Sequence, residues 1–266
     1  MSGARSYPRS LSVVAAGVVT FIVLPLPFII IYAFSPTSYL VFPPTGVTGK
    51  WFVNFFANDR FRAAMFNSLS ISTIVTIATL AIALPTAVLA VRHPFRGRGV
   101  LLGLVSAPLL VPGVVTGMAA LSLLAQSGIG VGYWPIVVAM TCFTLPLALR
   151  PLVANLAGVD PDLETAARNL GAGRLKAFIL ATLPSLTPGL IASGTFAFVE
   201  AMDNFSITVF LTDLRTTTLP VEAFSYIRDF DDPTVAAMAT LLILLSIAIV
   251  FMIEKLLGLD RFLDLG

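Results

Sequence analysis

The sequence predicts an all-α membrane protein, a polytopic bundle of six transmembrane helices formed as one domain over residues 1–266. Of the 266 residues, 57% are hydrophobic and 11% are charged, and the mean hydropathy is +0.95. A soluble domain could not cover that much apolar surface. A second observation is that the charges cluster, which leaves long apolar stretches between them. A third is one polar segment, residues 160–184, which interrupts the apolar stretches and carries its own helix signals.

An apolar stretch of about 20 residues can cross a bilayer as a helix. The six expected spans are Leu11–Phe34, Asn67–Val91, Val100–Leu124, Tyr133–Leu152, Thr182–Asp203 and Thr234–Ile253. A cleaved signal peptide is the alternative for the first stretch. The apolar region of such a peptide is usually only about 7–15 residues long, so we favour an uncleaved helix.

Prolines and glycines inside these spans predict local features. Proline removes a backbone hydrogen bond, so prolines in the first, third and fourth spans should kink their helices. They are Pro25, Pro27, Pro108, Pro112, Pro146 and Pro151. In the third span, Gly113 and Gly117 are spaced to let a neighbouring helix approach closely.

The distribution of Lys and Arg predicts the orientation of the spans. Six spans put both termini on one side, and the side richer in Lys and Arg is the cytoplasmic one. On the membrane side that holds the termini and the polar segment, the basic residues are Arg5, Arg9, Arg92, Arg96, Arg98, Arg150, Arg168, Arg174, Lys176, Lys255 and Arg261. The loops 35–66 and 204–233 carry only Lys50, Arg60, Arg62, Arg215 and Arg228. We therefore expect both termini and the polar segment in the cytoplasm.

The polar segment predicts a short, well-capped helix. Asp160 is a good N-cap, and Pro161 suits the first helical position, where no amide donor is needed. Asp162 and Glu164 follow where the helix dipole favours negative charge, and Gly171 is placed to end the helix in a left-handed conformation. The segment is either a solvated loop helix between two spans or a docking helix for a cytoplasmic partner.

Two carboxylates near the end of the fifth span are candidates for a functional site, because ionisable groups inside a bilayer are costly. Glu200 and Asp203 are three residues apart and share roughly one helix face, with Asn204 beside them and Phe198 and Phe205 close in sequence. Carboxylates among aromatic rings would suit a cationic amine through charge pairing and cation–π contact. Alternatively, Asp203 caps the helix end and the rings face lipid or packed helices.

The composition argues against several other classes of site. With one cysteine, Cys142, and one histidine, His93, the chain can form no internal disulfide, zinc cluster or His-dependent triad of its own. We predict no catalytic and no metal-binding residues. Gly46–Lys50 lacks the spacing and the helix context of a phosphate-binding loop. The net charge of +2 mostly records the excess of Lys and Arg on one side of the membrane, and we expect no nucleic-acid partner.

The polar segment resembles the cytoplasmic EAA motif of ABC importer permeases. The residues that match the motif in register are Ala166, Ala167, Gly171, Leu183 and Pro184. Thr165 holds the position of the motif's Glu, with Glu164 one place earlier, and Ala181 stands where the motif usually has Ile.

Other stretches resemble the spermidine/putrescine-type branch of these permeases, and the resemblance spans roughly residues 65–255. They are Asn67–Leu69, Phe95–Arg98, Pro108–Pro112, Asp160–Pro161, Leu170–Ala172 and Thr217–Val221. The branch usually carries Asp-Asp or Asp-Glu followed by Phe late in the fifth span. This chain has Asp203-Asn204-Phe205 there and adds Glu200.

The resemblance implies a type I ABC importer permease of the bacterial inner membrane, which is not itself an enzyme. The partners it implies are a second, similar permease in a heterodimer, two ATP-binding subunits, a periplasmic binding protein and the lipid membrane. ATP and Mg would be bound by the partner ATPase, with no cofactor in this chain. The coupling helix, about residues 160–171, would dock on one ATPase through Glu164, Thr165, Ala166, Ala167, Arg168, Leu170 and Gly171.

The resemblance and the carboxylates together suggest a small, polar, amine-bearing solute, similar to a polyamine, as substrate. The residues expected along its pathway are Glu200, Asp203, Asn204, Phe198 and Phe205. Two other functions stay open. A secondary transporter could use Glu200 and Asp203 for ion coupling, although the internal repeats that are frequent in such proteins are not evident. A non-transporting membrane scaffold would account for the docking helix but not for the carboxylates.

Overall fold

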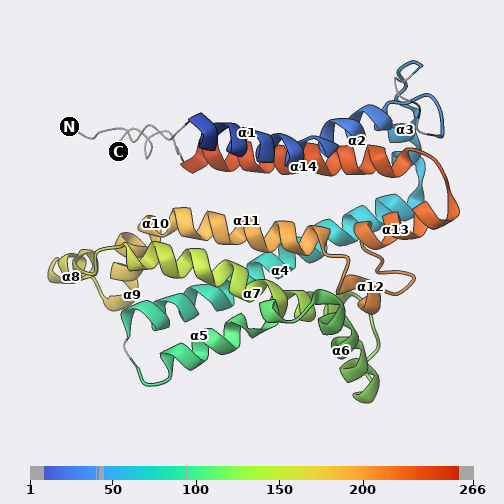
Figure 1. Cartoon of the computed structure of the whole chain (residues 1–266). Coiled ribbons are helices and arrows are strands. Elements are labelled where there is room, and N and C mark those ends of the chain that lie inside the picture. The colour runs from blue at the N-terminus through green and yellow to red at the C-terminus, as the bar shows by residue number, and fades with distance from the viewer. Residues whose placement is uncertain (1–8, 40, 42–44, 94, 258–266) are drawn as a thin grey trace. The chain divides into compact units, whose positions relative to one another are not determined.

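A computed structural model describes residues 9–39, 41, 45–93 and 95–257 of the chain. Every regular element in these ranges is a helix, as the sequence predicts (Figure 1). The described residues form two compact units. One holds the chain up to Arg62 together with Ala223–Val250, and the other holds Ala63–Glu222 with the residues from Phe251 onward. The expected single domain over residues 1–266 stays a prediction.

The first unit contains the N-terminal helices and most of the last helix. Its helices are α1 (Arg9–Val23), α2 (Pro25–Ala33), α3 (Lys50–Ala57) and most of α14 (Thr234–Leu257), with the start of α4 (Asp59–Arg92) and the end of α13 (Leu219–Asp229). Ala33, Trp51 and Ala237 form its buried cluster. α1 ends at Val23 and α2 begins at Pro25, so a break in the helix lies where the kink is predicted.

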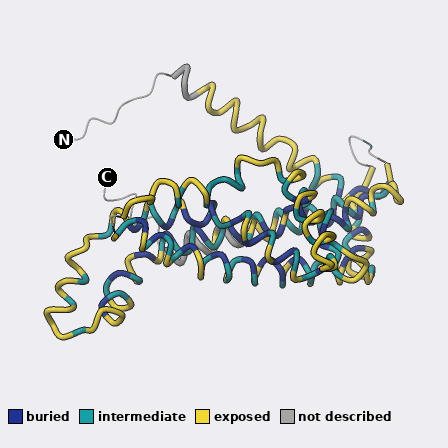
Figure 2. Tube along the Cα trace, turned by 90° about the horizontal axis from the view of Figure 1, so that it is seen from below, coloured by how far each residue is buried: buried dark blue, intermediate teal, exposed yellow. Residues whose placement is uncertain are grey.

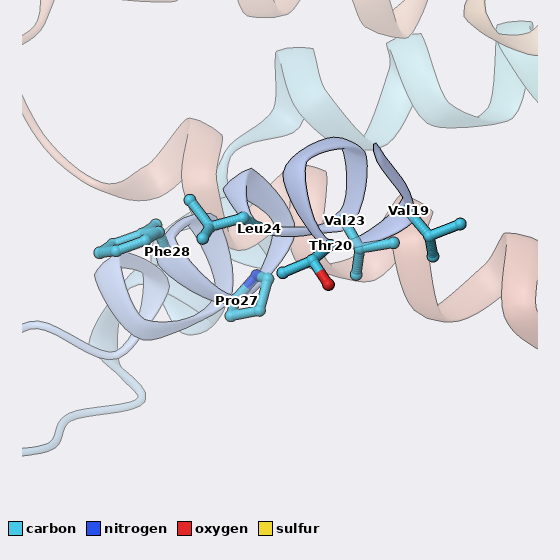
Figure 3. Close-up of a pocket in the computed structure, with 6 residues that line it drawn as sticks. All are labelled: Val19, Thr20, Val23, Leu24, Pro27 and Phe28. Atoms are coloured by element: carbon cyan, nitrogen blue, oxygen red, sulfur yellow. The ribbon is translucent and has the colours of Figure 1, made fainter. Parts of the chain in front are cut away.

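The break between α1 and α2 borders an apolar hollow of about 480 Å³ (Figure 3). Its lining residues are Val19, Thr20, Val23, Leu24, Pro27 and Phe28. The most apolar window of Val13–Ala33 contains no buried residue, and α1 is exposed along its described length (Figure 2). An apolar surface of this length suits a helix that lies in lipid.

The helices agree with the positions of the expected spans but leave their number a prediction. Within the described residues, the helices long and apolar enough to cross a membrane are Val13–Ala33, Asp59–Arg92 and Tyr133–Ala157. Two further spans are present if each of two sharply bent helix pairs counts as one, and Thr234–Ala248 is a shorter apolar helix. All of them overlap the apolar stretches predicted from the sequence.

The third expected span is bent far more than a simple proline kink. It consists of α5 (Arg98–Ser106), a 3₁₀ helix (Ala107–Leu110) and α6 (Gly113–Gln126), with a bend of 100° between the two parts. Pro108 lies in the 3₁₀ helix and Pro112 directly precedes α6, so the break falls where the prolines predicted it. By contrast, α7 (Tyr133–Ala157) continues without interruption through Pro146 and Pro151.

The fifth expected span is also bent. It is built from α9 (Arg174–Ala177), a π-helix η2 (Phe178–Thr182), α10 (Leu183–Ser185) and α11 (Thr187–Asp203). The part up to Ser185 and α11 enclose an angle of 71°. Prolines and π-helical turns are frequent causes of such bends, and Pro184 and Pro188 lie on either side of this one.

The core of the second unit is made by α4, α7 and α11. α11 packs along α7 (Figure 1), and Ser193 Oγ donates to the carbonyl oxygen of Ala148 at 2.6 Å. The hydroxyls of Thr79 on α4 and Thr144 on α7 form a buried hydrogen bond of 2.8 Å. Polar side chains that are satisfied between helices in this way contribute to packing inside a membrane.

Gly113 and Gly117 permit the close approach predicted from their spacing, but the neighbour is the short helix α12 (Thr208–Leu211) and the residues before it rather than another full span. A Cβ on Gly117 would lie 3.0 Å from the Cα of Ile207, and one on Gly113 would lie 3.0 Å from the Cβ of Ser206. Side chains larger than hydrogen therefore have no room at Gly117.

Hydrogen bonds define two opposite ends of the second unit. Where α4 and α7 both finish, Arg92 Nη2 donates to the carbonyl oxygen of Val159 at 3.0 Å. Near the start of α4, the Asn67 amide donates to the carbonyl oxygens of Arg215 and Thr217, each at 3.1 Å. The polar segment follows directly after the first of these ends, and Asn67 marks the other.

Candidate functional site

The polar segment forms the short helix α8 (Asp162–Asn169). Asp160 Oδ1 accepts a hydrogen bond from the backbone N–H of Asp162 at 2.9 Å, so the Asp160 side chain caps the helix start as predicted. The helix itself begins at Asp162, one residue after the predicted first position, Pro161. Gly171 has a φ of +94°, and its N–H donates to the carbonyl oxygen of Arg168 at 2.9 Å. The predicted left-handed end is therefore also present, and both ends of α8 are fixed by local chemistry.

The two sides of α8 differ in exposure. Glu164 and Ala167 are half-buried on the side where α8 packs against α9 and η2. Thr165, Ala166 and Arg168 are exposed, and Leu170, just after the helix, is 90% exposed. Exposed apolar and small residues on a capped helix are a surface suited to a protein partner.

Glu164 joins α8 to the fifth span. The hydroxyl of Thr182, which is 1% exposed, donates to Glu164 Oε1. Thr182 is the last residue of the π-helix η2, and only the short helix α10 separates it from the bend that leads into α11. A hydrogen bond to a charged acceptor is stronger than one between neutral groups. Glu164, the acid nearest the motif's Glu position, thus points toward the protein interior, while Thr165 is exposed.

At the opposite end of the second unit, Asn204 organises the carboxylate cluster predicted from the sequence. Its amide donates to Glu200 Oε1 at 2.9 Å, and its Oδ1 accepts from the backbone N–H of Ile207 at 2.9 Å. The side chain is 9% exposed. Asn204 therefore fixes Glu200 on α11 and at the same time holds the chain entering α12.

The Asn204 amide bonds Glu200 and not Asp203. The Asp203 side chain is exposed on the surface of the chain, whereas Glu200, Phe198 and Phe205 are half-buried. The structure thus brings Glu200 and Asn204 together and leaves the carboxylate of Asp203 accessible to a ligand or to another subunit.

Two stretches that each resemble the same permease branch meet at this end. Besides the bonds from Asn67, the backbone N–H of Leu219 donates to Ser68 Oγ at 2.8 Å. The loop after α12 is further ordered by Asp213, whose Oδ1 accepts from the N–H groups of Arg215 and Thr216, each at 2.8 Å. Asn67 and Ser68 of α4 are therefore joined by hydrogen bonds to the loop before α13.

We expect the stability of this loop to depend on pH through Asp213. The hydrogen bond from the Thr216 hydroxyl, helped by those from the backbone, lowers the pKa of Asp213 below its usual value. Because the pKa of Asp213 is lower in the folded than in the unfolded state, its ionised carboxylate stabilises the fold at pH values above the unfolded-state pKa. This stabilisation is lost as the pH falls through the folded-state pKa. Asp213→Ala should therefore lower the thermal unfolding midpoint at neutral pH, and the difference from the wild type should shrink on acidification to about pH 3.

Asp229→Ala, at an exposed aspartate, is the matched control and should give a smaller difference at neutral pH. A difference for Asp213→Ala that stays constant from neutral to acidic pH would contradict the assignment.

Some residues in these sites were not predicted from the sequence. Thr182 carried no signal, because its partner is 18 positions away. The pairing of Glu200 with Asn204 agrees with their spacing, since residues four apart lie on the same face of a helix. Asp213 and Thr216 also show the spacing of a local side-chain-to-backbone turn.

Comparisons with known proteins agree with these features. The family described as binding-protein-dependent transport system inner membrane component matches residues 79–258. The putrescine transport system permease protein PotI of Escherichia coli (strain K12) is 32% identical over 232 residues, which cover 84% of this chain and 82% of that protein. A probable molybdenum ABC transporter permease protein of Haloferax volcanii is 33% identical over 251 residues, 91% of this chain and 87% of that one.

A solved structure has the same fold. It is the crystal structure of a bacterial ABC transporter involved in the import of the acidic polysaccharide alginate, with a TM-score of 0.73 and 17% sequence identity. The match covers 94% of this chain and 98% of the matched chain. These comparisons do not favour the alternative of an ion-coupled secondary transporter.

Proposed function

Because the chain belongs to the family of binding-protein-dependent transport system inner membrane components, and its fold is that of the importer permeases, we propose that α8 couples it to a separate ATPase. The permease itself has no catalytic role. The observation that carries the proposal is α8 itself, a helix capped at both ends with an exposed surface of small and apolar side chains. Rigidity is what a docking element needs if it is to transmit movement.

The connection from α8 to the spans supports the same role. α8 packs on α9 and η2, and Glu164 bonds Thr182, which only α10 separates from the bend into α11. A displacement of α8 by an ATPase would therefore reach α11 through a short path of packed and hydrogen-bonded residues. α11 carries Glu200 and Asp203 at its other end, so the path joins the two candidate sites.

The remaining subunits and the orientation follow from this proposal. The chain would pair with a second, similar permease in a heterodimer, with two ATPase subunits that bind ATP and Mg beneath the pair and a periplasmic binding protein above it. The Lys and Arg distribution supports cytoplasmic termini and a cytoplasmic α8 in the bacterial inner membrane.

Disruption of α8 tests the coupling role. Ala166→Pro removes a backbone donor in the helix interior and should cost about 3 kcal/mol of helix stability, so we expect the permease to lose its co-purifying ATPase. Ala166→Ser at the same exposed position keeps the helix and should retain the ATPase. Both variants must reach the membrane in wild-type amounts. An ATPase that stays bound to Ala166→Pro, or uptake by the chain alone in liposomes without any ATPase, would refute the role.

For the substrate, the carboxylates favour an amine-bearing solute similar to a polyamine. PotI is named for putrescine and the Haloferax relative for molybdenum, so identity alone does not choose between them. Glu200 and Asp203 bring two acidic groups to the end of α11, with Phe198 and Phe205 in the same stretch. A cationic ligand gains charge pairing and cation–π contact there, whereas an oxyanion would be repelled.

Asp203→Asn tests the substrate class in the complete reconstituted transporter. A charged hydrogen bond is worth about 1.5–3 kcal/mol, so uptake of labelled putrescine should fall roughly tenfold or more while the amount of assembled complex is unchanged. Asp229→Asn, which neutralises an exposed aspartate on α13, is the control and should leave uptake near the wild-type value. Equal losses of uptake and assembly would make Asp203 structural, and stimulation of ATP hydrolysis by molybdate but not putrescine would refute the amine assignment.

A further inference from the structure

Beside α8 lies a polar hollow of about 520 Å³. Its lining residues are Thr165, Arg168, Asn169, Ala172, Gly173 and Arg174. They come from the second half of α8, the left-handed turn after it and the first residue of α9. The hollow therefore opens between two helices that are fixed relative to each other by packing.

The charge of this hollow is uncompensated. Two arginines, Arg168 and Arg174, line it, and none of its described lining residues carries a carboxylate. In the described part of the chain, the ion pair that is present joins Arg62 to Asp59, so neither of these arginines is paired. Of the acids on α8, Glu164 is turned away to Thr182 and Asp162 lies in the first turn.

Arginine placed in this way recognises planar anions. The guanidinium group offers a fork of donors that matches a carboxylate in a bidentate manner. Thr165 and Asn169 add a hydroxyl and an amide on the same lining. Thr165 and Arg168 line the hollow and also belong to the exposed surface of α8 that the proposed function assigns to the ATPase. The hollow therefore opens on that surface.

We propose that this hollow, residues 165–174, receives an acidic side chain, Asp or Glu, of the ATPase subunit. The proposal rests on the proposed function and specifies its chemistry, because it makes the permease side of the contact basic. Thr165 at the motif's Glu position fits this assignment, since a carboxylate there would offset one of the two positive charges of the hollow.

The experiment uses the complete transporter in lipid nanodiscs and measures how much ATPase the permease retains at increasing NaCl concentration. Arg168→Glu together with Arg174→Glu should weaken ATPase binding roughly tenfold at low salt, because like charges then face each other, and should flatten the salt dependence. Lys176→Glu is the matched control, an exposed basic residue on α9 outside the hollow lining. It should change binding by less than about twofold.

A photo-crosslinking residue at position 165 identifies the occupant directly. The expected product joins the permease to an ATPase peptide that contains Asp or Glu, and exchanging that acid for Arg should restore binding to the Arg168→Glu, Arg174→Glu variant. A crosslink to lipid, or unchanged ATPase binding in this variant while Ala166→Pro abolishes it, would overturn the hollow as a carboxylate site and leave the docking helix intact. An ATPase that never binds the wild-type permease would instead refute the proposed function.

Discussion

Replacement of Gly117 by alanine is expected to destabilise the permease, although the same change in an ordinary helix interior stabilises by roughly 1 kcal/mol. The added Cβ would lie 2.7 Å from Phe210 Cδ2, 3.0 Å from the Cα of Ile207 and 3.1 Å from its carbonyl oxygen. Two of these three atoms belong to the backbone and cannot rotate away. Overpacking of this kind costs about 1–3 kcal/mol or more, so it exceeds the gain in helix propensity.

Gly103→Ala provides a control with the opposite expected sign. Gly103 lies inside α5, and no atom comes within 4 Å of a Cβ placed there. The variant should be neutral or more stable than the wild type, while Gly117→Ala should show a lower thermal unfolding midpoint and less monodisperse protein in detergent. If both variants shift stability in the same direction by similar amounts, the contact between α6 and residues 207–210 does not determine the packing of this bend.

Features governed by composition and local chemistry could be predicted from the sequence. Charge-free stretches give the positions of the spans because a bilayer excludes charged groups over a fixed thickness. The ends of α8 were predictable because a capping aspartate and a left-handed glycine act through neighbouring residues. The fifth-span carboxylates were visible because ionisable groups stand out in an apolar stretch.

Features governed by distant contacts could not be predicted. Prolines marked the break in the third span, but its 100° angle depends on what α5 and α6 pack against. Asn67 and Thr217 both resemble the same permease branch, yet their contact joins residues 150 positions apart. The hydrogen-bond partner of Glu164 could not be predicted either, because Thr182 lies 18 positions away in the sequence. The sequence indicated an acid in the first turn of α8, where the helix dipole alone accounts for it, and only the fold shows that it bonds Thr182.

The bond between Glu164 and Thr182 gives the second large effect. Thr182→Val keeps the branched shape of the buried side chain but removes the donor to Glu164. We expect the ATPase to remain bound and active, because the exposed surface of α8 is unchanged. Transport per ATP hydrolysed should fall roughly tenfold, because a hydrogen bond to a charged group contributes about 1.5–3 kcal/mol to holding α8 against the fifth span. The measurement is the ratio of uptake to ATP hydrolysis in proteoliposomes.

Three further variants separate coupling from a general loss of stability. Thr182→Ser keeps the hydroxyl and should restore the ratio, whereas Glu164→Ala should reproduce the defect of Thr182→Val. Asp162→Ala removes another first-turn acid, one that lies on the exposed surface. It changes the interaction with the helix dipole but leaves the Glu164–Thr182 hydrogen bond in place, so it should leave the ratio unchanged.

If Asp162→Ala lowers the ratio as much as Glu164→Ala, the charge of the first turn matters and the bond to Thr182 does not. If Thr182→Val releases the ATPase, Thr182 supports the docking surface itself. The expected pattern, an occupied docking site with inefficient transport, arises only when α8 can move without carrying α11 with it.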